Sequence, residues 1–169
     1  TITKTMIKQI IRILFAICIE ICVLTTSNEL IAQKTITMKN ISGVNMLPCK
    51  VNGLPLNFIF DTGADVVTLS LTEALFMIKN DYLSRYDLFG ISRAQLANGD
   101  ITENTEIVLR EIEIEGIKIE NVKAVIIHNS KAPLLLGKSA MRKLGKIEID
   151  GNKLKIFPKN KNSINGMNF

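Results

Sequence analysis

The stretch Phe58-Ile59-Phe60-Asp61-Thr62-Gly63-Ala64-Asp65 decides the fold. Its three apolar residues predict a buried strand that delivers Asp61 rigidly at its end. Gly63 lets another backbone approach closely, and the hydroxyl of Thr62 can tie the turn to a neighbouring element. The stretch therefore predicts a loop that presents one carboxylate in a fixed position.

A single carboxylate of this kind is half of an acid–base site. Hydrolysis of a peptide bond without a metal or a covalent intermediate needs one group to activate water and another to protonate the amide. Two carboxylates about 3 Å apart can do both, because they share one proton. Asp65 is expected to point elsewhere, and Asp100 and Asp150 lack a comparable loop. A two-fold dimer would bring Asp61 of both copies to its axis.

The segments around this loop predict a mainly β domain over residues 44–158. Short apolar runs are separated by the tight-turn signals Asn52-Gly53, Glu115-Gly116 and Asp150-Gly151, which favour β-hairpins. A final hairpin is expected over residues 146–157.

Two short helices are expected within this domain. Ser70-Leu71-Thr72-Glu73 is a capping-box pattern that begins a helix reaching about Lys79. Residues 138–144 form the second helix, with Gly145 as its C-terminal stop. The first helix is expected to place three apolar residues on one face: Leu71, Leu75 and Ile78.

The segments outside the domain receive separate interpretations. Residues 1–33 combine a basic start, a short apolar centre and a small residue at Ala32, which favours a signal peptide. The alternative is a retained membrane anchor through residues 7–24. Either interpretation predicts an exported domain, which is periplasmic, extracellular or membrane-anchored and faces away from the cytoplasm. Residues 34–43 are expected to be a polar connector, and residues 159–169 a disordered tail.

Composition argues against several other classes of function. The net charge of +5 comes from scattered lysines without interleaved aromatic residues, so no nucleic-acid partner is expected. Three cysteines without metal-ligand spacing and a single histidine predict no metal site, and no cofactor is expected. Cys49 is interpreted as a small apolar strand residue, because no partner pattern for a nucleophilic cysteine accompanies it.

Three motifs resemble those of the retropepsin-like aspartic peptidases, both the retroviral enzymes and bacterial exported members. They are Phe60 to Asp65, Leu135-Leu136-Gly137-Lys138 followed by a helix, and Ala97-Asn98-Gly99-Asp100, which is similar to a flap tip. The Asp-Thr-Gly and Leu-Leu-Gly motifs follow one another along the chain in the order that this family has. The resemblance implies a closed β-barrel of the acid-protease type with one or two short helices. It also implies an aspartic endopeptidase in which water is activated between two Asp61 carboxylates of a homodimer, with a peptide or protein as substrate.

The resemblance assigns roles to individual residues. Asp61 would be the catalytic carboxylate, Thr62 would hydrogen-bond across the dimer, and Gly63 would let the substrate backbone approach. Asp65 would bind the substrate main chain and pair with Lys138, where retroviral enzymes have arginine. The implied substrate-binding residues are Ala64, Asp65, Ala97, Asn98 and Gly99, and the implied structural support comes from Leu135, Leu136, Gly137 and Lys138.

The departures from the family pattern are also informative. Ala64 lacks the hydroxyl that pepsin-type sites often carry there, so the pH optimum is expected to be mildly rather than strongly acidic. The stretch 71–96 is longer than its retroviral counterpart, and the chain ends do not match the interleaved retroviral ends, so the sequence does not define the dimer interface. The alternative function is a noncatalytic peptide-binding or scaffold domain with a retropepsin fold.

Overall fold

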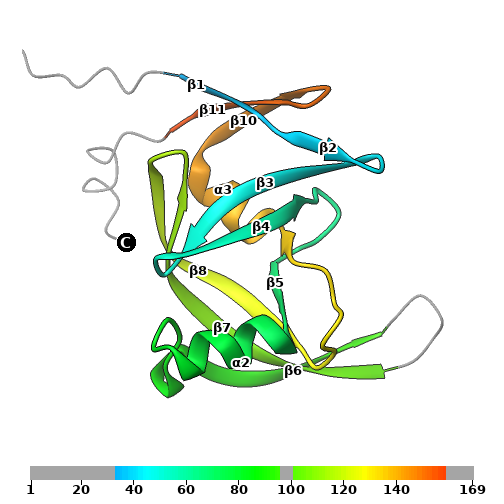
Figure 1. Ribbon diagram of the computed structural model, residues 1–169, viewed down its shortest axis with the longest axis vertical. Coiled ribbons are helices and arrows are strands. Elements are labelled where there is room, and N and C mark those ends of the chain that lie inside the picture. The colour runs from blue at the N-terminus through cyan, green and yellow to red at the C-terminus, as the bar shows by residue number, and fades with distance from the viewer. Residues whose placement is uncertain (1–32, 96–100, 159–169) are drawn as a thin grey trace, which may run out of the picture. The chain divides into compact units, whose positions relative to one another are not determined.

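The computed structural model describes residues 33–95 and 101–158 (Figure 1). The leader over residues 1–32, the predicted flap tip over residues 96–100 and the tail over residues 159–169 lie outside the described residues. Strands dominate the described part. They are β1 (Lys34–Thr37), β2 (Lys39–Ile41), β3 (Val44–Val51), β4 (Leu54–Phe60), β5 (Val67–Ser70), β6 (Leu88–Gln95), β7 (Ile101–Ile114), β8 (Ile117–Ile127), β9 (Leu135–Leu136), β10 (Lys146–Asp150) and β11 (Lys153–Phe157). The helices are α2 (Leu71–Lys79), the 3-10 turn η1 (Arg85–Asp87) and α3 (Lys138–Leu144).

The strands form one large and one small sheet. The large sheet has the order β2-β3-β4-β9-β5-β8-β7-β6, and the small sheet has the order β1-β11-β10. An additional antiparallel pairing joins Lys50 to Glu113 and Val51 to Ile112. This pairing between β3 and β7 closes six strands into a ring and leaves β2 and β6 as edges. The predicted mainly β class is confirmed.

Two hairpins of the ring turn where the sequence predicted. Asn52 and Gly53 have φ values of 50° and 92°, and Glu115 and Gly116 have φ values of 49° and 82°. Two consecutive residues with positive φ match the right-handed twist of the flanking strands. The turns therefore fix the register of β3 against β4 and of β7 against β8.

The expectation of a polar connector over residues 34–43 is wrong. This segment contains β1, which pairs with β11, and β2, which pairs with β3. Ile36 is 6% exposed and Met38 is 1% exposed, so both belong to the core. The sequence signal was weak because two buried residues separated by one position are too few to establish a strand period.

The first helix buries a different face from the one expected. Ser70 caps α2 by accepting a hydrogen bond from the backbone N–H of Glu73 at 3.3 Å. The buried residues are Ala74 and Met77, whereas Leu75 and Ile78 are exposed. The helix carries apolar residues on most of its circumference, so periodicity alone did not select the side that packs.

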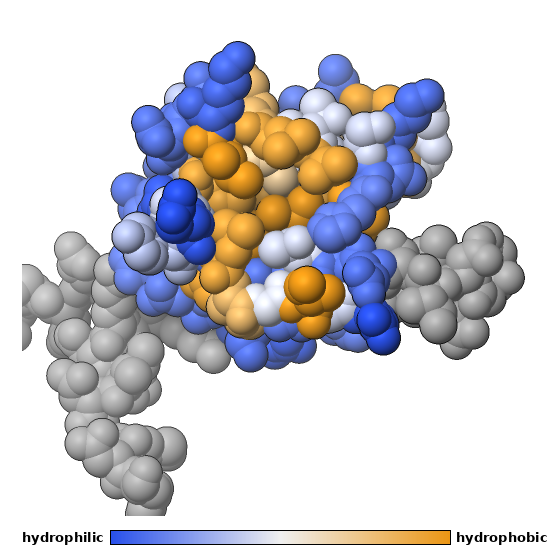
Figure 2. All heavy atoms as spheres, turned by 90° about the horizontal axis from the view of Figure 1, so that it is seen from below, coloured by the Kyte–Doolittle hydropathy of each residue, from blue (hydrophilic) through white to orange (hydrophobic). Residues whose placement is uncertain are grey.

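Exposed apolar side chains gather around this helix and the adjacent edge strand. Figure 2 shows a broad apolar area on the lower face of the molecule, where Figure 1 places α2 and β6. The exposed members from these two elements are Leu75, Phe76, Ile78, Phe89 and Ile91.

The second helix agrees with its prediction. The α3 helix ends at Leu144, and Gly145 follows with a φ of 103°, which a glycine adopts at little cost. Within the residues that the structure describes, no helix is long and apolar enough to cross a membrane.

Candidate active site

The predicted catalytic loop follows β4 directly. Asp61 is half-buried, while Thr62 and Gly63 are exposed. The backbone N–H of Gly63 donates a hydrogen bond to Asp61 Oδ1 at 2.8 Å. A Cβ atom on Gly63 would lie 3.1 Å from the same oxygen, so a side chain at this position would crowd the Asp61 carboxylate. The loop thus presents Asp61 in a defined orientation, as the sequence predicted.

The short strand β9 crosses between the two strands that flank this loop. It runs parallel to β4, with Ile59 opposite Leu135 and Phe60 opposite Leu136. The backbone N–H of Asp61 extends this ladder by donating to the carbonyl oxygen of Leu136 at 3.2 Å. The predicted support from Leu135 and Leu136 is therefore a backbone ladder that reaches the candidate catalytic residue itself.

The hydroxyl of Thr68 joins the crossing from the other side. Thr68 Oγ1 donates to the carbonyl oxygen of Pro133 at 3.0 Å and accepts from the backbone N–H of Leu135 at 3.0 Å. Thr68 is 7% exposed and sits on β5, opposite Leu135. Both strands flanking the catalytic loop are thus tied to β9.

Gly137 fits against the backbone of the catalytic loop. A Cβ atom at this position would lie 2.8 Å from the carbonyl oxygen of Ala64 and 2.7 Å from the carbonyl carbon of Val66, and even closer to the oxygen of Val66. Real Cβ atoms do not approach backbone atoms at such distances. Glycine is needed here because of close packing, since its φ of −92° is available to other residues.

The beginning of α3 completes what we call the loop brace, residues 137–139. The backbone N–H of Lys138 donates to the carbonyl oxygen of Ala64 at 2.9 Å, and that of Ser139 donates to the carbonyl oxygen of Asp65 at 3.0 Å. The buried hydroxyl of Ser139 accepts from the N–H of Val67 at 3.0 Å and donates to the carbonyl oxygen of Lys123 at 2.7 Å. Sequence analysis missed Ser139, because no local pattern distinguishes a helical serine that bonds to distant backbone.

The ion pair expected between Asp65 and Lys138 is present. Lys138 Nζ lies 3.1 Å from Asp65 Oδ1, and the two side chains are 44% and 86% exposed. Solvent screens such an exposed pair, so its contribution to stability is small. The pair orients the Asp65 carboxylate next to the catalytic loop, while the buried backbone contacts of the loop brace provide the rigidity.

The other predicted site residues divide into two groups. Ala64 is half-buried in the loop, and its carbonyl oxygen accepts the bond from Lys138 described above. The flap-tip residues Ala97, Asn98 and Gly99 lie outside the described residues.

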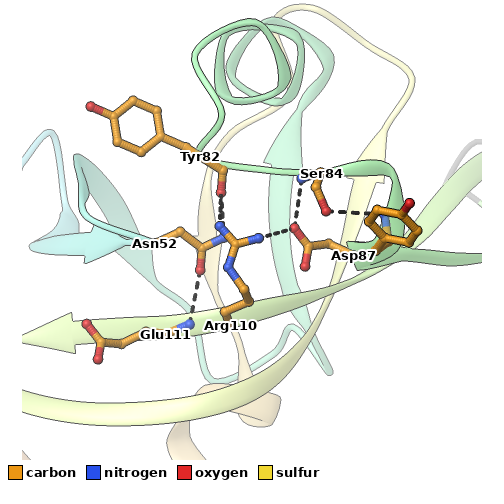
Figure 3. A network of polar contacts seen from close by, with 7 residues as sticks. Asn52, Tyr82, Ser84, Asp87, Arg110 and Glu111 are labelled. Carbon is orange, nitrogen blue, oxygen red and sulfur yellow. Dashed lines mark hydrogen bonds and ion pairs between the residues drawn. The ribbon is translucent and has the colours of Figure 1, made fainter.

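The strands β6 and β7 form the hairpin that leads to the predicted flap tip. They pair antiparallel, and their register shifts between Leu88 and Gly90, which marks a β-bulge near the base of the hairpin. At that base a polar network, which we call the flap-root clamp, joins Asn52, Asp87 and Arg110 (Figure 3).

Each member of the flap-root clamp bonds to at least two other residues. Arg110 pairs with the carboxylate of Asp87, which also accepts from the N–H of Ser84 at 2.8 Å. The carbonyl oxygen of Tyr82 accepts from Asn52 Nδ2 at 2.7 Å and from Arg110 Nη2 at 3.1 Å. The segment before β6 is therefore fixed to β7 and to the β3–β4 turn.

One face of the large sheet is continuous from the catalytic loop to the flap hairpin. Residues that are partners across a ladder have their side chains on the same face of the sheet. Each residue in the following series is the ladder partner of the next, so all of them share one face: Ile59, Leu135, Thr68, Val125 and Glu106. We call this the open face, because side chains on it are mostly half-buried. Asp61 follows Ile59 by two residues, so its side chain belongs to the same face. The opposite face is the core face and includes Phe58, Leu69, Ala124, Ile126, Ile107 and Leu136, all buried.

Cys49 behaves as an apolar strand residue, as predicted. It is 4% exposed, and burial raises the pKa of its thiol to about 12. The thiol is therefore protonated near neutral pH and is not an activated nucleophile. Among the residues that the structure describes, no three acidic, histidine or cysteine side chains cluster as metal ligands would.

Comparison with known proteins identifies the family. Residues 47–143 match the family of gag-polyprotein putative aspartyl proteases, whereas no curated protein matches the sequence. The fold is similar to the crystal structure of a retropepsin-like aspartic protease from Rickettsia conorii, with a TM-score of 0.57 and 22% identity, over 73% of this chain and 98% of that one. A protease of EIAV, solved with the inhibitor HBY-793, aligns with a TM-score of 0.49 and 20% identity, over 66% of this chain and 97% of that one. The chain belongs to the family of gag-polyprotein putative aspartyl proteases, and its fold is that of a retropepsin-like aspartic protease.

Proposed function

We propose that the protein is an aspartic endopeptidase that activates water between the Asp61 carboxylates of two identical subunits. The observation that carries this proposal is the rigid presentation of Asp61, whose loop is fixed by β9 and by the loop brace. One carboxylate would accept a proton from water while the other protonates the leaving amine. The peptide substrate would bind in an extended conformation between the catalytic loop and the flap hairpin.

The homodimer is part of the proposal, because each chain has one Asp-Thr-Gly loop. Exposure of Thr62 and Gly63 supports it, since both residues are accessible to a second subunit. A closed two-fold dimer is the simplest arrangement that pairs the same residue from two copies.

The decisive experiment compares the wild type with Asp61→Asn on a mixed peptide library. The substitution keeps the shape of the side chain and removes its charge, so cleavage should fall at least about a thousandfold. Asp81→Asn is the matched control, because Asp81 is exposed and has a φ of 62°, which asparagine accepts readily. Equal cleavage by the wild type and Asp61→Asn would refute the proposal and favour a noncatalytic peptide-binding domain.

A mixing experiment tests the shared site separately. When wild type and Asp61→Asn subunits exchange freely at a one-to-one ratio, about a quarter of the dimers are wild type on both sides. Activity at fixed total concentration should fall to that fraction if both carboxylates are required. A fall to one half would indicate that each chain acts alone.

We also propose that the domain functions outside the cytoplasm. The basic start and the apolar centre of residues 1–33 support this proposal. N-terminal sequencing of the protein from cell fractions distinguishes a cleaved signal peptide from a retained anchor. Recovery of the intact chain in the cytoplasmic fraction would contradict export.

A further inference from the structure

We propose that Asn104 and Glu106, on the open face of the flap strand β7, form a subsite for a basic side chain of the substrate. The inference rests on the proposed peptidase function, and it names the class of peptide that the same cleft would prefer. We call the pair the acceptor subsite.

Asn104 contributes a buried hydrogen-bond acceptor without a partner. Asn104 is 6% exposed, and its Oδ1 has no hydrogen-bond partner among the residues that the structure describes. Buried polar atoms are almost always paired, because an unpaired one loses its bond to water without replacement. A donor from a bound substrate would satisfy this oxygen.

Glu106 adds a negative charge beside this oxygen. It lies two residues after Asn104 on the same strand, so both side chains occupy the open face. A Cβ atom on Gly90 would lie 3.3 Å from Glu106 Oε2, which places the carboxylate over the neighbouring strand. Glu106 forms no ion pair with any residue that the structure describes, so its charge is available to a ligand.

The neighbouring strand β6 presents small residues beside the two acceptors. Gly90 is the register partner of Glu106, and Ser92 is the register partner of Asn104. Both partners are small, so no large side chain of β6 is the direct register partner of either acceptor. Ile91, whose register partner is Thr105, belongs to the other face of the sheet and is exposed, and Phe89 lies at the β-bulge and is also exposed.

The position and chemistry of the acceptor subsite favour a cation. The open face extends from Asp61 to this part of β7, so a strand bound under the flap would pass it. Every second side chain of an extended peptide points to the same side, so one of them could face Asn104 and Glu106. Lysine and arginine carry several donors and no acceptor, which matches one amide oxygen and one carboxylate better than a neutral amide does.

The test uses three peptides that differ at one position, which carries lysine, glutamine or norleucine. A scan along a cleaved peptide locates the position with the largest effect. For the wild type we expect lysine to exceed norleucine at least about tenfold in kcat/KM, with glutamine between them. Asn104→Leu and Glu106→Gln should each reduce that ratio several-fold. Glu111→Gln on the same strand is the matched control and should leave the ratio unchanged.

Binding measurements separate this inference from the proposed activity. Calorimetric titration of Asp61→Asn with the same peptides reports recognition without cleavage. If the wild type cleaves none of the peptides but Asp61→Asn still binds the lysine peptide most tightly and the norleucine peptide most weakly, the subsite is retained and the proposed peptidase activity is refuted. Equal values for lysine and norleucine, or a preference for glutamate, would overturn the subsite even if cleavage is efficient. If Asn104→Leu does not fold, Asn104→Ser and Glu106→Gln provide the same comparison.

Discussion

The loop brace and the flap-root clamp hold two parts of the same site by different means. The loop brace uses buried backbone contacts around Gly137 and two hydrogen bonds of the buried Ser139 hydroxyl. The flap-root clamp uses longer side chains, and Arg110 within it is 48% exposed. Buried, sterically tight contacts fail together with the fold, whereas exposed polar contacts can open locally. The comparison predicts that the catalytic loop opens only when the whole fold unfolds, whereas residues 81–93 at the flap-root clamp open locally.

The largest expected effect is that of Gly137→Ala. The added methyl group meets backbone atoms of Ala64 and Val66 that cannot rotate away. We expect a loss of at least about 3 kcal/mol in the free energy of unfolding, measured by urea denaturation. Gly43→Ala is a suitable control, because Gly43 has open space around it but a φ of 86°. An equal, modest loss of about 1 kcal/mol in both variants would show that the steric argument is wrong.

Ser139→Ala should have the next largest effect. It removes two hydrogen bonds and leaves the N–H of Val67 without its partner, which should cost about 2 kcal/mol of unfolding free energy. Proteolytic kcat should fall while KM changes little, because the catalytic loop shifts and the flap does not. Ser139→Thr keeps the hydroxyl and should recover most of both quantities. If the alanine and threonine variants lose equally, packing rather than hydrogen bonding is responsible.

Asp87→Asn tests the flap-root clamp and should act locally. The variant can still accept from Ser84 but loses its charge-assisted bond to Arg110, so the global loss should be about 1 kcal/mol or less. Hydrogen exchange should accelerate in residues 81–93 and stay unchanged in residues 58–70. Faster exchange in both segments would mean that the two regions are not independent.

The smallest effect is expected for Lys118→Gln. Glu111 raises the pKa of Lys118 through a hydrogen bond and its charge, but the Lys118 side chain is 56% exposed. A raised pKa means that any stabilisation is present at neutral pH and is lost as pH rises through that pKa. We expect no resolvable change in unfolding free energy at pH 7. A clear loss at pH 7 that disappears at high pH would show that exposed pairs matter more here than assumed.

The sequence predicted the elements whose signals are local. The apolar run before Asp61, the paired turn residues at Asn52 and at Glu115, and the stop at Gly145 each specify their own conformation. These features were sufficient for the mainly β class, and the order of the motifs indicated the family. The candidate catalytic loop was predicted for the same reason, since strand, carboxylate and glycine are contiguous.

Only the tertiary structure decided the features that depend on distant partners. Ser139 bonds to the backbone of Val67, which is 72 residues away in the chain. The buried face of α2, the membership of β1 and β2 in the sheets, and the unpaired oxygen of Asn104 likewise depend on what packs beside them. A sequence records the preferences of each residue for its neighbours along the chain, whereas burial and hydrogen-bond partners are set when remote segments meet.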